Sequence, residues 1–465
     1  MTTVPARSGP VPKEAEPSAH AGAAVLLASG ATFLALLDAT VVNVAFPDLR
    51  RSFPDISLSH LSWVITAYAV VFAALLAAAG RLADVLGRRR LFLVSVLAFV
   101  VTSLAAGAAP SAPLLIAARA AQGAAAAGMI PSALGLLLSH TPPAKRAAAL
   151  GAWGAAGGMA AAVGPSLGGL LVESWDWRVV FLINVPLGLL IAYGTLRLSA
   201  DAPSGRRLAD PVGIVALVLA IGSPVTALSQ GTDWGWSSWK VLCLFAGGVV
   251  FGLVVALRSR RHPAPALETD LWRSPVFTAA NITSALFGAA MYAWLLACPL
   301  YLASVWHYSV LKSGLGVTPG AFLAAAGAVV VGRRMPVERQ WRAVMFGGLL
   351  AGASFAAMGL TLDSSPEYAA LWLPPGLLGG LGIGCVLTGL SSIASAALPA
   401  DRFAAGSGML MTSRQVGGAV GVAGLAVILQ SEGLATPDGF LTGFVWCGVV
   451  AALAGVSAVG LRSRA

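Results

Sequence analysis

Apolar residues fill this chain in long blocks that polar residues interrupt only briefly. Each block approaches or exceeds the roughly 20 residues that an α-helix needs to cross the hydrocarbon core of a bilayer. The pattern therefore predicts an all-α membrane protein with about fourteen spanning helices. The residue range 277–306 is longer than one crossing requires, so that helix is expected to tilt or kink. The predicted spans begin near Ala24, Leu61, Leu91, Pro113, Ala147, Val179, Val212, Val241, Phe277, Gly314, Ala343, Leu371, Ala404 and Phe440.

Composition excludes an ordinary soluble domain. Hydrophobic residues make up 57% of the 465 residues and charged residues only 10%, which leaves too little polar surface to cover a globule. The first 20 residues are polar and rich in proline, and they lack the short apolar core and cleavage site of a signal peptide. We therefore expect residues 1–21 to form a disordered cytoplasmic tail.

Basic residues fix the predicted orientation, because Lys and Arg accumulate in cytoplasmic loops. An even number of spans with both termini in the cytoplasm puts most of the 29 basic residues on the inner side. The same asymmetry explains the net charge of +10 by short loops beside anionic lipid headgroups, and nucleic acid is not an expected partner. The outer loops then hold only Arg50, Arg51, Arg178, Lys240 and Lys312.

Two polar breaks divide the predicted spans into six, two and six. Residues 197–210 follow the sixth span and residues 258–274 follow the eighth. Two six-helix halves with the substrate path between them are a common transporter plan. We expect a six-helix bundle over residues 22–199, two additional transmembrane helices over 200–274 and a second six-helix bundle over 275–465.

Ionisable groups deep inside a span are costly in lipid and indicate function. Asp38 is the one carboxylate that the pattern places clearly within a span, and Arg119 is predicted at a similar depth in the outer half of the fourth span. Burial would penalise the charged carboxylate and a nearby guanidinium would favour it. Asp38 and Arg119 are therefore candidate proton-coupling residues, with a static structural pair as the alternative.

The connection between the second and third spans has an unusual spacing of glycine and charge. Asp84 and Arg88 are one helical turn apart, and Asp84 is able to meet the positive N-terminus of a neighbouring helix as a latch on the cytoplasmic face. A run of inner basic residues would explain the arginines but not this spacing. The predicted cytoplasmic gate residues are Gly80, Asp84, Gly87, Arg88 and Arg89.

The fifth span combines a proline with closely spaced glycines. Proline removes one backbone hydrogen bond and bends a helix, and small residues let helix backbones approach closely. Either simple packing or a gating bend would account for the pattern. The residues concerned are Gly158, Gly164, Pro165, Gly168 and Gly169.

Substrate contacts are expected from aromatic, amide and charged side chains in the spans, although many such aromatics anchor helices in lipid instead. The candidates for the cavity are Asn43, Trp63, Tyr68, Gln122, Asn281, Tyr292, Trp294 and Arg414. The four cysteines show no metal-ligand or redox spacing, so no metal is expected, and they are interpreted as free, packed thiols.

Together these motifs resemble the major facilitator superfamily, specifically its fourteen-span drug:proton antiporter branch. Residues 37–47 are similar to the first-helix signature of that branch, and residues 80–90 are similar to the cytoplasmic loop motif. Further matches lie in the fourth span, in the glycine-rich fifth span, and in the segment that enters the sixth. The matching residues of the last three segments are Arg119, Gln122 and Gly123; Gly158, Gly164, Pro165, Gly168 and Gly169; and Trp177, Arg178, Phe181, Asn184 and Pro186.

The resemblance implies a bacterial inner-membrane exporter of small amphipathic drugs or antibiotics that works by alternating access. It implies that the proton gradient, and no cofactor, drives the cycle, that Arg119 takes part in proton coupling, and that the protein is a monomer among membrane lipids. The Arg414–Gln415 pair with Gly417 and Gly418 resembles a recurring element of the branch with a cavity or gate role.

Other functions remain open on the sequence. A dedicated exporter of one endogenous metabolite would have the same pattern, because specificity lies in the shape of the cavity. A uniporter or importer would not need the antiporter motif or Asp38, and a non-transporting membrane sensor gives no reason for charges in lipid. An enzyme is least expected, since the five histidines form no convincing nucleophile and base pair.

Overall fold

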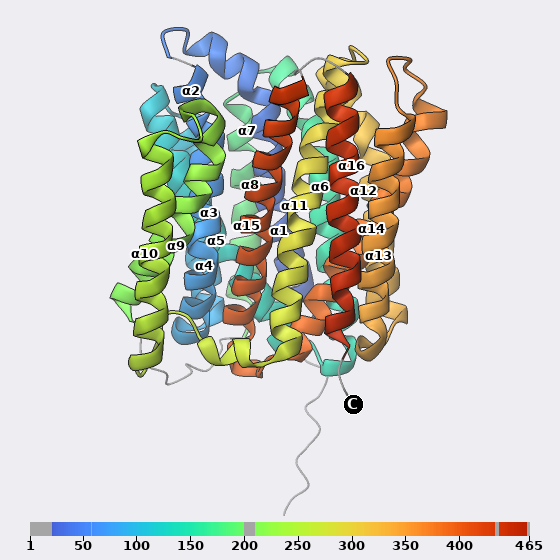
Figure 1. Ribbon diagram of the computed structural model, residues 1–465. Helices are drawn as coiled ribbons and strands as arrows, with labels where there is room; N and C mark the ends of the chain where they lie inside the picture. The colour runs from blue at the N-terminus through green and yellow to red at the C-terminus, as the bar shows by residue number, and fades with distance from the viewer. Residues whose placement is uncertain (1–20, 57, 200–209, 433–436, 463–465) are drawn as a thin grey trace, which may run out of the picture.

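The computed structural model describes residues 21–56, 58–199, 210–432 and 437–462. Helices dominate the described residues, which contain no strand. Fourteen of the helical segments are long and apolar enough to cross a membrane, and they run side by side (Figure 1). The prediction of an all-α membrane protein with about fourteen spans is confirmed.

The first six spans run from α1 to α8. Their helices are α1 (Ala21–Ser52), α3 (Trp63–Leu86), α4 (Arg88–Gly107), α5 (Ala112–His140), α6 (Arg146–Ser174), and α7 (Val179–Leu182) with α8 (Asn184–Leu196), which share the sixth span. Two shorter helices, α2 (Leu58–Leu61) and η1 (Pro143–Lys145), lie between them.

The seventh and eighth spans are α9 (Pro211–Trp234) and α10 (Trp239–Arg261). The last six spans are α11 (Pro275–Ser304), α12 (Val310–Arg334), α13 (Gln340–Thr361), α14 (Leu373–Ala396) with the preceding π-turn η4 (Tyr368–Trp372), α15 (Phe403–Glu432) and α16 (Pro437–Ser457). Short 3₁₀ helices connect or extend them, namely η2 (Thr269–Arg273), η3 (Val337–Arg339), η5 (Ala400–Arg402) and η6 (Ala458–Leu461).

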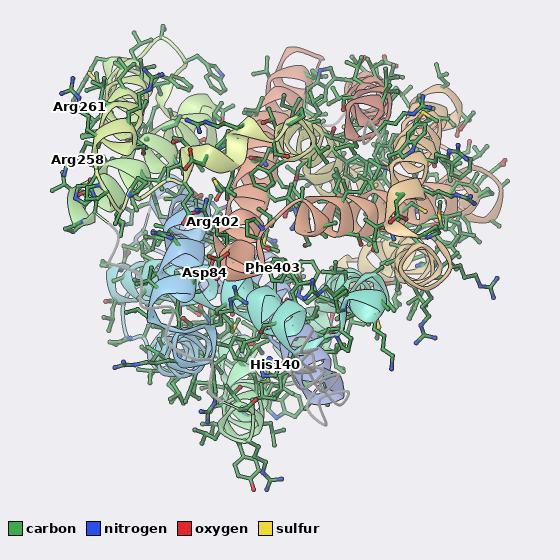
Figure 2. All side chains as sticks on the ribbon, turned by 90° about the horizontal axis from the view of Figure 1, so that it is seen from below. Asp84, His140, Arg258, Arg261, Arg402 and Phe403 are labelled. Carbon is green, nitrogen blue, oxygen red and sulfur yellow. The ribbon has the colours of Figure 1, made fainter. Side chains whose placement is uncertain are left out.

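Two helix pairs make most of the contact between the first six spans and the last six. α6 packs along α12, and α3 packs along α15. α9 lies against both α3 and α15, so the α9–α10 pair covers this junction from outside, as the view from below also shows (Figure 2). Residues 1–20 and 200–209, which hold most of the predicted tail and part of the predicted linker, lie outside the described residues.

Glycine permits the close approach of α6 and α12. A Cβ added to Gly151 would lie 2.6 Å from the carbonyl oxygen of Ala328, and one added to Gly332 would overlap the carbonyl oxygen of Ala147. Backbone therefore meets backbone at two places on this pair. In lipid, where the hydrophobic effect does not drive helices together, such contact contributes dispersion energy between the two halves.

α10 lies on the periphery. Of its residues only Val241 and Val255 are buried, and large apolar side chains such as Val249 and Leu253 are exposed, as expected of a helix that faces lipid. Cys243, on the same helix, is exposed as well. The prediction of packed thiols is therefore wrong for Cys243, because α10 has few neighbours, while Cys298, Cys385 and Cys447 are free and buried.

The predicted loop between the second and third spans is almost entirely helical, which corrects the sequence interpretation. α3 continues to Leu86 and α4 begins at Arg88, so only Gly87 is outside a helix. Gly87 has a φ of 96°, a conformation that other residues adopt at a cost, and it allows the chain to turn within a single residue. Most of the remaining residues of the motif are Ala, Leu and Arg, which favour helix, so the two helices extend up to this single residue.

Candidate functional site

A buried ion pair joins α1 to α5 in the first half. The Arg119 Nη1 donates to Asp38 Oδ2 at 2.6 Å, and each of the two residues is 1% exposed. The structure thus brings together the two proton-coupling candidates. Charges at this depth are costly unless they are paired and hydrogen-bonded, so the remaining partners of both groups matter.

Amide side chains complete the surroundings of the carboxylate. Asp38 Oδ1 accepts from Gln122 Nε2 at 3.0 Å and from Asn184 Nδ2 at 2.7 Å. Gln122 also donates to Ser103 Oγ at 2.8 Å. α1, α4, α5 and α8 therefore meet at Asp38, and a change in the charge of this one carboxyl acts on four helices at once.

The guanidinium of Arg119 is held from three sides. Its Nε donates to the carbonyl oxygen of Val64 at 3.0 Å, and its Nη1 also contacts Gln122 Oε1 at 2.6 Å. The ring of Tyr68 lies under the guanidinium, 4.3 Å from centroid to Cζ, an arrangement that stabilises a desolvated cation. Tyr68 is fixed in turn by donating to the carbonyl oxygen of Ala35.

Ser103 and Asn184 were missed as site residues. Ser103 lies in an apolar span where nothing in the sequence separates it from other small polar residues. Asn184 stands in the segment that resembles the entry to the sixth span, which was a usable signal. The break at Ile183 between α7 and α8 places Asn184 at the start of α8, where its side chain reaches Asp38.

The C-terminal end of α3 and the N-terminal end of α15 are latched together by a carboxylate at a helix N-terminus. Asp84 Oδ2 accepts from the backbone N–H of Ala405 at 2.8 Å and Oδ1 from that of Ala404 at 3.4 Å. Arg88 Nε donates to Asp84 Oδ1 at 2.9 Å. The positive end of the α15 dipole and two free N–H groups favour the negative charge, and Figure 2 shows Asp84 beside Phe403 at the centre of this face.

The gate candidates Gly80 and Arg89 contact different parts of the protein. Gly80 lies against the carbonyl of Ala404, where an added Cβ would overlap the oxygen. Arg89 points away from this contact and donates to the carbonyl oxygens of Thr195 and Leu196 at the end of α8. Arg89 therefore caps a helix within the first half and does not bridge the halves through these bonds.

A second ionic contact crosses the same face. Glu268, in the connection between α10 and α11, pairs with Arg81 of α3 and lies 3.0 Å from Arg402 of η5. Glu268 was not predictable from the sequence, since its partners are distant in the chain. The additional helix pair is thereby tied through its linker to both sides of the α3–α15 junction.

Asp210 forms a separate ion pair at the start of α9. Arg258 Nε and Nη2 donate to its carboxylate at 2.5 and 2.9 Å, and these bonds lower the pKa of Asp210 to about 2. The group therefore stays ionised at any cellular pH, which suits a structural link between α9 and α10 and excludes a role as a reversible proton carrier.

The glycine motif of α6 packs on α1 and α12. Gly164 and Gly168 face Thr40 and Val41 of α1, whereas Gly158 faces α12. Pro165 lies inside α6, and Gly314 at the start of α12 packs on it. α1, which carries Asp38, therefore rests on the part of α6 that also touches the other half.

Replacing Gly164 with alanine is expected to disturb this packing. The new methyl group would overlap the side-chain oxygen of Thr40, and overpacking of this kind costs about 1–3 kcal/mol. We expect a lower melting temperature of the purified protein. Gly169→Ala is the matched control, since its nearest neighbour is 4.0 Å away. Adding Thr40→Ala to Gly164→Ala removes the overlapping oxygen but leaves the Thr40 Cβ 2.9 Å from the new methyl, so it should restore part of the stability. Equal melting temperatures for the two alanine variants would contradict the assignment.

The cavity candidates fall into different surroundings. Gln122 belongs to the Asp38 cluster and Asn281 is bonded within its own half, where Ser413 Oγ donates to Asn281 Oδ1 at 2.8 Å. Trp63 lies near Trp234 of α9, with 6.4 Å between ring centroids, and Asn43 is exposed. Their contact with a substrate stays a prediction, as does that of Tyr68, Tyr292, Trp294 and Arg414.

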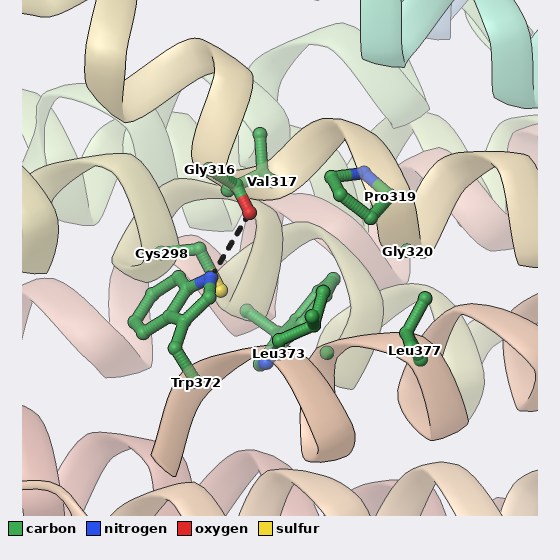
Figure 3. Close-up of a pocket in the computed structure, with 10 residues that line it drawn as sticks. Cys298, Gly316, Val317, Pro319, Gly320, Trp372, Leu373 and Leu377 are labelled. Carbon is green, nitrogen blue, oxygen red and sulfur yellow. Dashed lines mark hydrogen bonds between the residues drawn. The ribbon is translucent and has the colours of Figure 1, made fainter. Parts of the chain in front are cut away.

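Trp294 lies inside the second half. It stacks on Phe355 with 4.6 Å between ring centroids, and it lines a small apolar pocket between α11, α12 and α14 (Figure 3). In this pocket the Trp372 indole N–H donates to the carbonyl oxygen of Gly316 at 3.1 Å. Through these contacts Trp294 packs within the second half of the protein.

No cluster of three or more His, Cys, Asp or Glu side chains that would hold a metal ion occurs among the residues that the structure describes. The Asp38 site consists of a buried carboxyl, a guanidinium and amides. Such a set is suited to binding and releasing a proton or a small polar ligand.

Comparisons with known proteins agree with this arrangement. The profile of the Major Facilitator Superfamily matches residues 28–422. The chain is 32% identical to the methylenomycin A resistance protein of Streptomyces coelicolor, covering 100% of this chain and 98% of that protein. It is 34% identical to the multidrug resistance protein Stp of Mycobacterium tuberculosis, covering 87% and 75%. Among solved structures, the human organic anion transporter MFSD10 shares the fold, with a TM-score of 0.68 at 15% identity over 94% of this chain and 99% of that one.

Proposed function

The chain belongs to the major facilitator superfamily, and we propose that it is a proton-coupled antiporter that exports small amphipathic drugs or antibiotics. The observation that carries this proposal is the Asp38–Arg119 pair, a titratable carboxyl 1% exposed within the membrane. The drug and antibiotic resistance proteins to which the chain is similar over most of its length support the substrate class.

Proton coupling requires that Asp38 bind and release a proton during the cycle. Protonation would remove the negative charge that holds Arg119, Gln122 and Asn184 together, so four helices would relax toward a different packing. The side-chain oxygen of Asn184 has no hydrogen-bond partner within the described residues, and rotation of this amide would offer an acceptor to the protonated carboxyl. One proton thus changes the relative stability of two arrangements of the first half.

The latch on the cytoplasmic face controls when substrate enters during the cycle. Asp84 and Glu268 hold α3, α15 and the η5 segment together on the cytoplasmic face, so substrate from the cytoplasm enters only when these contacts open. Alternating access then consists of opening this face while the opposite one closes, with one half rocking against the other.

The remaining attributes follow from this function. The exporter works as a monomer in the cytoplasmic membrane of a bacterium, with both termini in the cytoplasm and lipids around its fourteen spans. Its partners are the substrate and protons. The proton gradient supplies the energy without a cofactor, and the protein is not an enzyme.

Expression in a bacterium that lacks its own efflux pumps tests this function. We expect the protein to raise the inhibitory concentration of at least one compound in a panel that includes puromycin and methylenomycin A. Uptake of that compound into everted membrane vesicles should then follow an imposed pH gradient and stop on addition of a protonophore. Uptake that survives the protonophore would contradict proton coupling, and a panel without any protected compound would contradict drug export.

A further inference from the structure

Arg414 is a charge within the membrane that has no counter-ion among the residues that the structure describes. Three other arginines of the described spans have acidic partners: Arg119 pairs with Asp38, Arg88 with Asp84, and Arg81 with Glu268. The Nε of Arg414 is buried and without a hydrogen-bond partner in the described part of the chain, and none of the described ion pairs includes this residue. Arg414 as a whole is half-buried, but a guanidinium inside a span without a described counter-ion is costly, which indicates that its partner is bound only part of the time.

The depth of Arg414 excludes a lipid headgroup as the partner. The span runs from Phe403 to Leu429, and Arg414 lies eleven residues from its cytoplasmic end, roughly 16 Å along the helix. Half the hydrocarbon thickness is about 15 Å, so the residue lies near the midplane. An arginine side chain is too short to reach the interface between membrane and water from the midplane.

The side of α15 that carries Arg414 faces the interior of the protein. Leu410 and Gly417 contact α11, whereas Ala404 and Gly408 contact α3, and at 3.6 residues per turn Arg414 lies between these two faces. The exposed Val420 is about 120° away around the helix. A Cβ added to Gly288 of α11 would lie 3.0 Å from the Cγ of Arg414.

Aromatic neighbours connect this position to the coupling site. The ring of Tyr292 covers Gly418, one turn beyond Arg414 on α15. α15 also packs along α3, the helix that carries Tyr68, and Tyr68 lies under the guanidinium of Arg119. Arg414 therefore stands on the second half, on the side toward the residues that bind Asp38 in the first half.

We propose that Arg414 binds an anionic group of the exported molecule, such as a carboxylate, and so selects amphipathic anions over neutral or cationic ones. This inference rests on the proposed export function. A planar guanidinium with five N–H donors matches a carboxylate in two parallel hydrogen bonds, and Gln415, which has no hydrogen bond within the described residues, is the next polar side chain on α15.

The charge of the substrate has a consequence for the energetics of export. An anion that leaves the cell and a proton that enters both move positive charge inward. The membrane potential then favours the exchange in addition to the pH difference. Because Arg414 belongs to α15 and Asp38 to α1, the anion and the proton do not compete for one group, and their alternation comes from the rocking of the two halves.

Two dansyl probes that differ only in charge test the proposal. Dansylglycine carries a carboxylate and dansylglycinamide a neutral amide in the same place. We would titrate both into the full-length protein in nanodiscs of zwitterionic lipid and follow dansyl fluorescence. Wild type is expected to bind the carboxylate at least about tenfold more tightly than the amide, since charge-assisted hydrogen bonds are roughly twice as strong as neutral ones.

The variants separate binding from folding. Arg414→Gln should lose the preference for the carboxylate while its affinity for the amide stays unchanged, and Arg414→Lys should keep part of the preference. Arg342→Gln removes one exposed cytoplasmic charge and should behave as wild type. Absence of the preference in wild type, or its persistence in Arg414→Gln, would overturn the proposal. Because these are binding measurements, they are independent of the protonophore test of proton-coupled export.

Discussion

Replacing Asp38 with asparagine is expected to abolish proton-driven export. Asparagine has nearly the same shape and leaves its amide to contact Arg119, but it cannot take up a proton. A pump that carries one proton fewer per cycle loses about 2.3 kcal/mol of driving force per 100 mV, or about a fiftyfold smaller substrate gradient. The measurement is the steady-state accumulation ratio of the exported compound in everted vesicles at equal protein levels.

Folding must be controlled in this experiment. Removing one partner of a buried ion pair costs about 3–5 kcal/mol because the other charge is left uncompensated. Asp38→Asn combined with Arg119→Gln removes both charges and should recover much of the melting temperature while export stays absent. If Asp38→Asn alone sustained the wild-type gradient, Asp38 would not be the proton carrier.

Adding one methyl group at Gly80 is expected to keep the cytoplasmic face open. The Cβ of alanine would overlap the backbone oxygen of Ala404, and backbone yields less readily than the end of a side chain. A cost of about 1–3 kcal/mol borne by the closed arrangement alone shifts its population about 5- to 150-fold. Export should fall accordingly, although the protein remains folded.

The expected readout is the reactivity of a cysteine placed at the interface. Leu76 is fully buried where Gly408 of α15 crosses α3, so Leu76→Cys in a background without the native cysteines should react slowly with a membrane-impermeant maleimide. Gly80→Ala should accelerate this reaction from the cytoplasmic side. Gly252→Ala, whose Cβ would meet nothing within 4 Å, serves as the control for an added methyl on a spanning helix. Slow labelling in Gly80→Ala would show that Gly80 does not limit closure.

The fold was predictable because lipid imposes a simple rule on the sequence. A helix in a bilayer needs a long apolar block, and fourteen such blocks stand clearly between the charged connections. Element boundaries were less predictable. The residues from Gly80 to Leu86 were assigned to a loop for their charges, yet their helix propensity and the single turn at Gly87 extend α3 to its neighbour.

The site was only partly predictable. Asp38 and Arg119 carry charge where charge is costly, and Asp84 stands at a distinctive spacing from glycines and Arg88, so the sequence alone marks all three. Ser103 and Glu268 depend on which helices become neighbours, and a single sequence does not contain that information. The stacking of Trp294 on Phe355 was unpredictable for the same reason. An aromatic residue in a span gives the same sequence pattern whether it packs within a bundle or faces the central path.

Simultaneous measurement of proton and substrate flux in proteoliposomes tests proton-coupled export most directly. The purified protein would be loaded with an outward gradient of the compound that it protects cells against, without any initial pH difference, and a trapped pH dye would follow protons. We predict that efflux of the compound drives protons in the opposite direction in wild type and that Asp38→Asn moves no protons. Efflux of the compound by wild type with no change of internal pH would contradict the account.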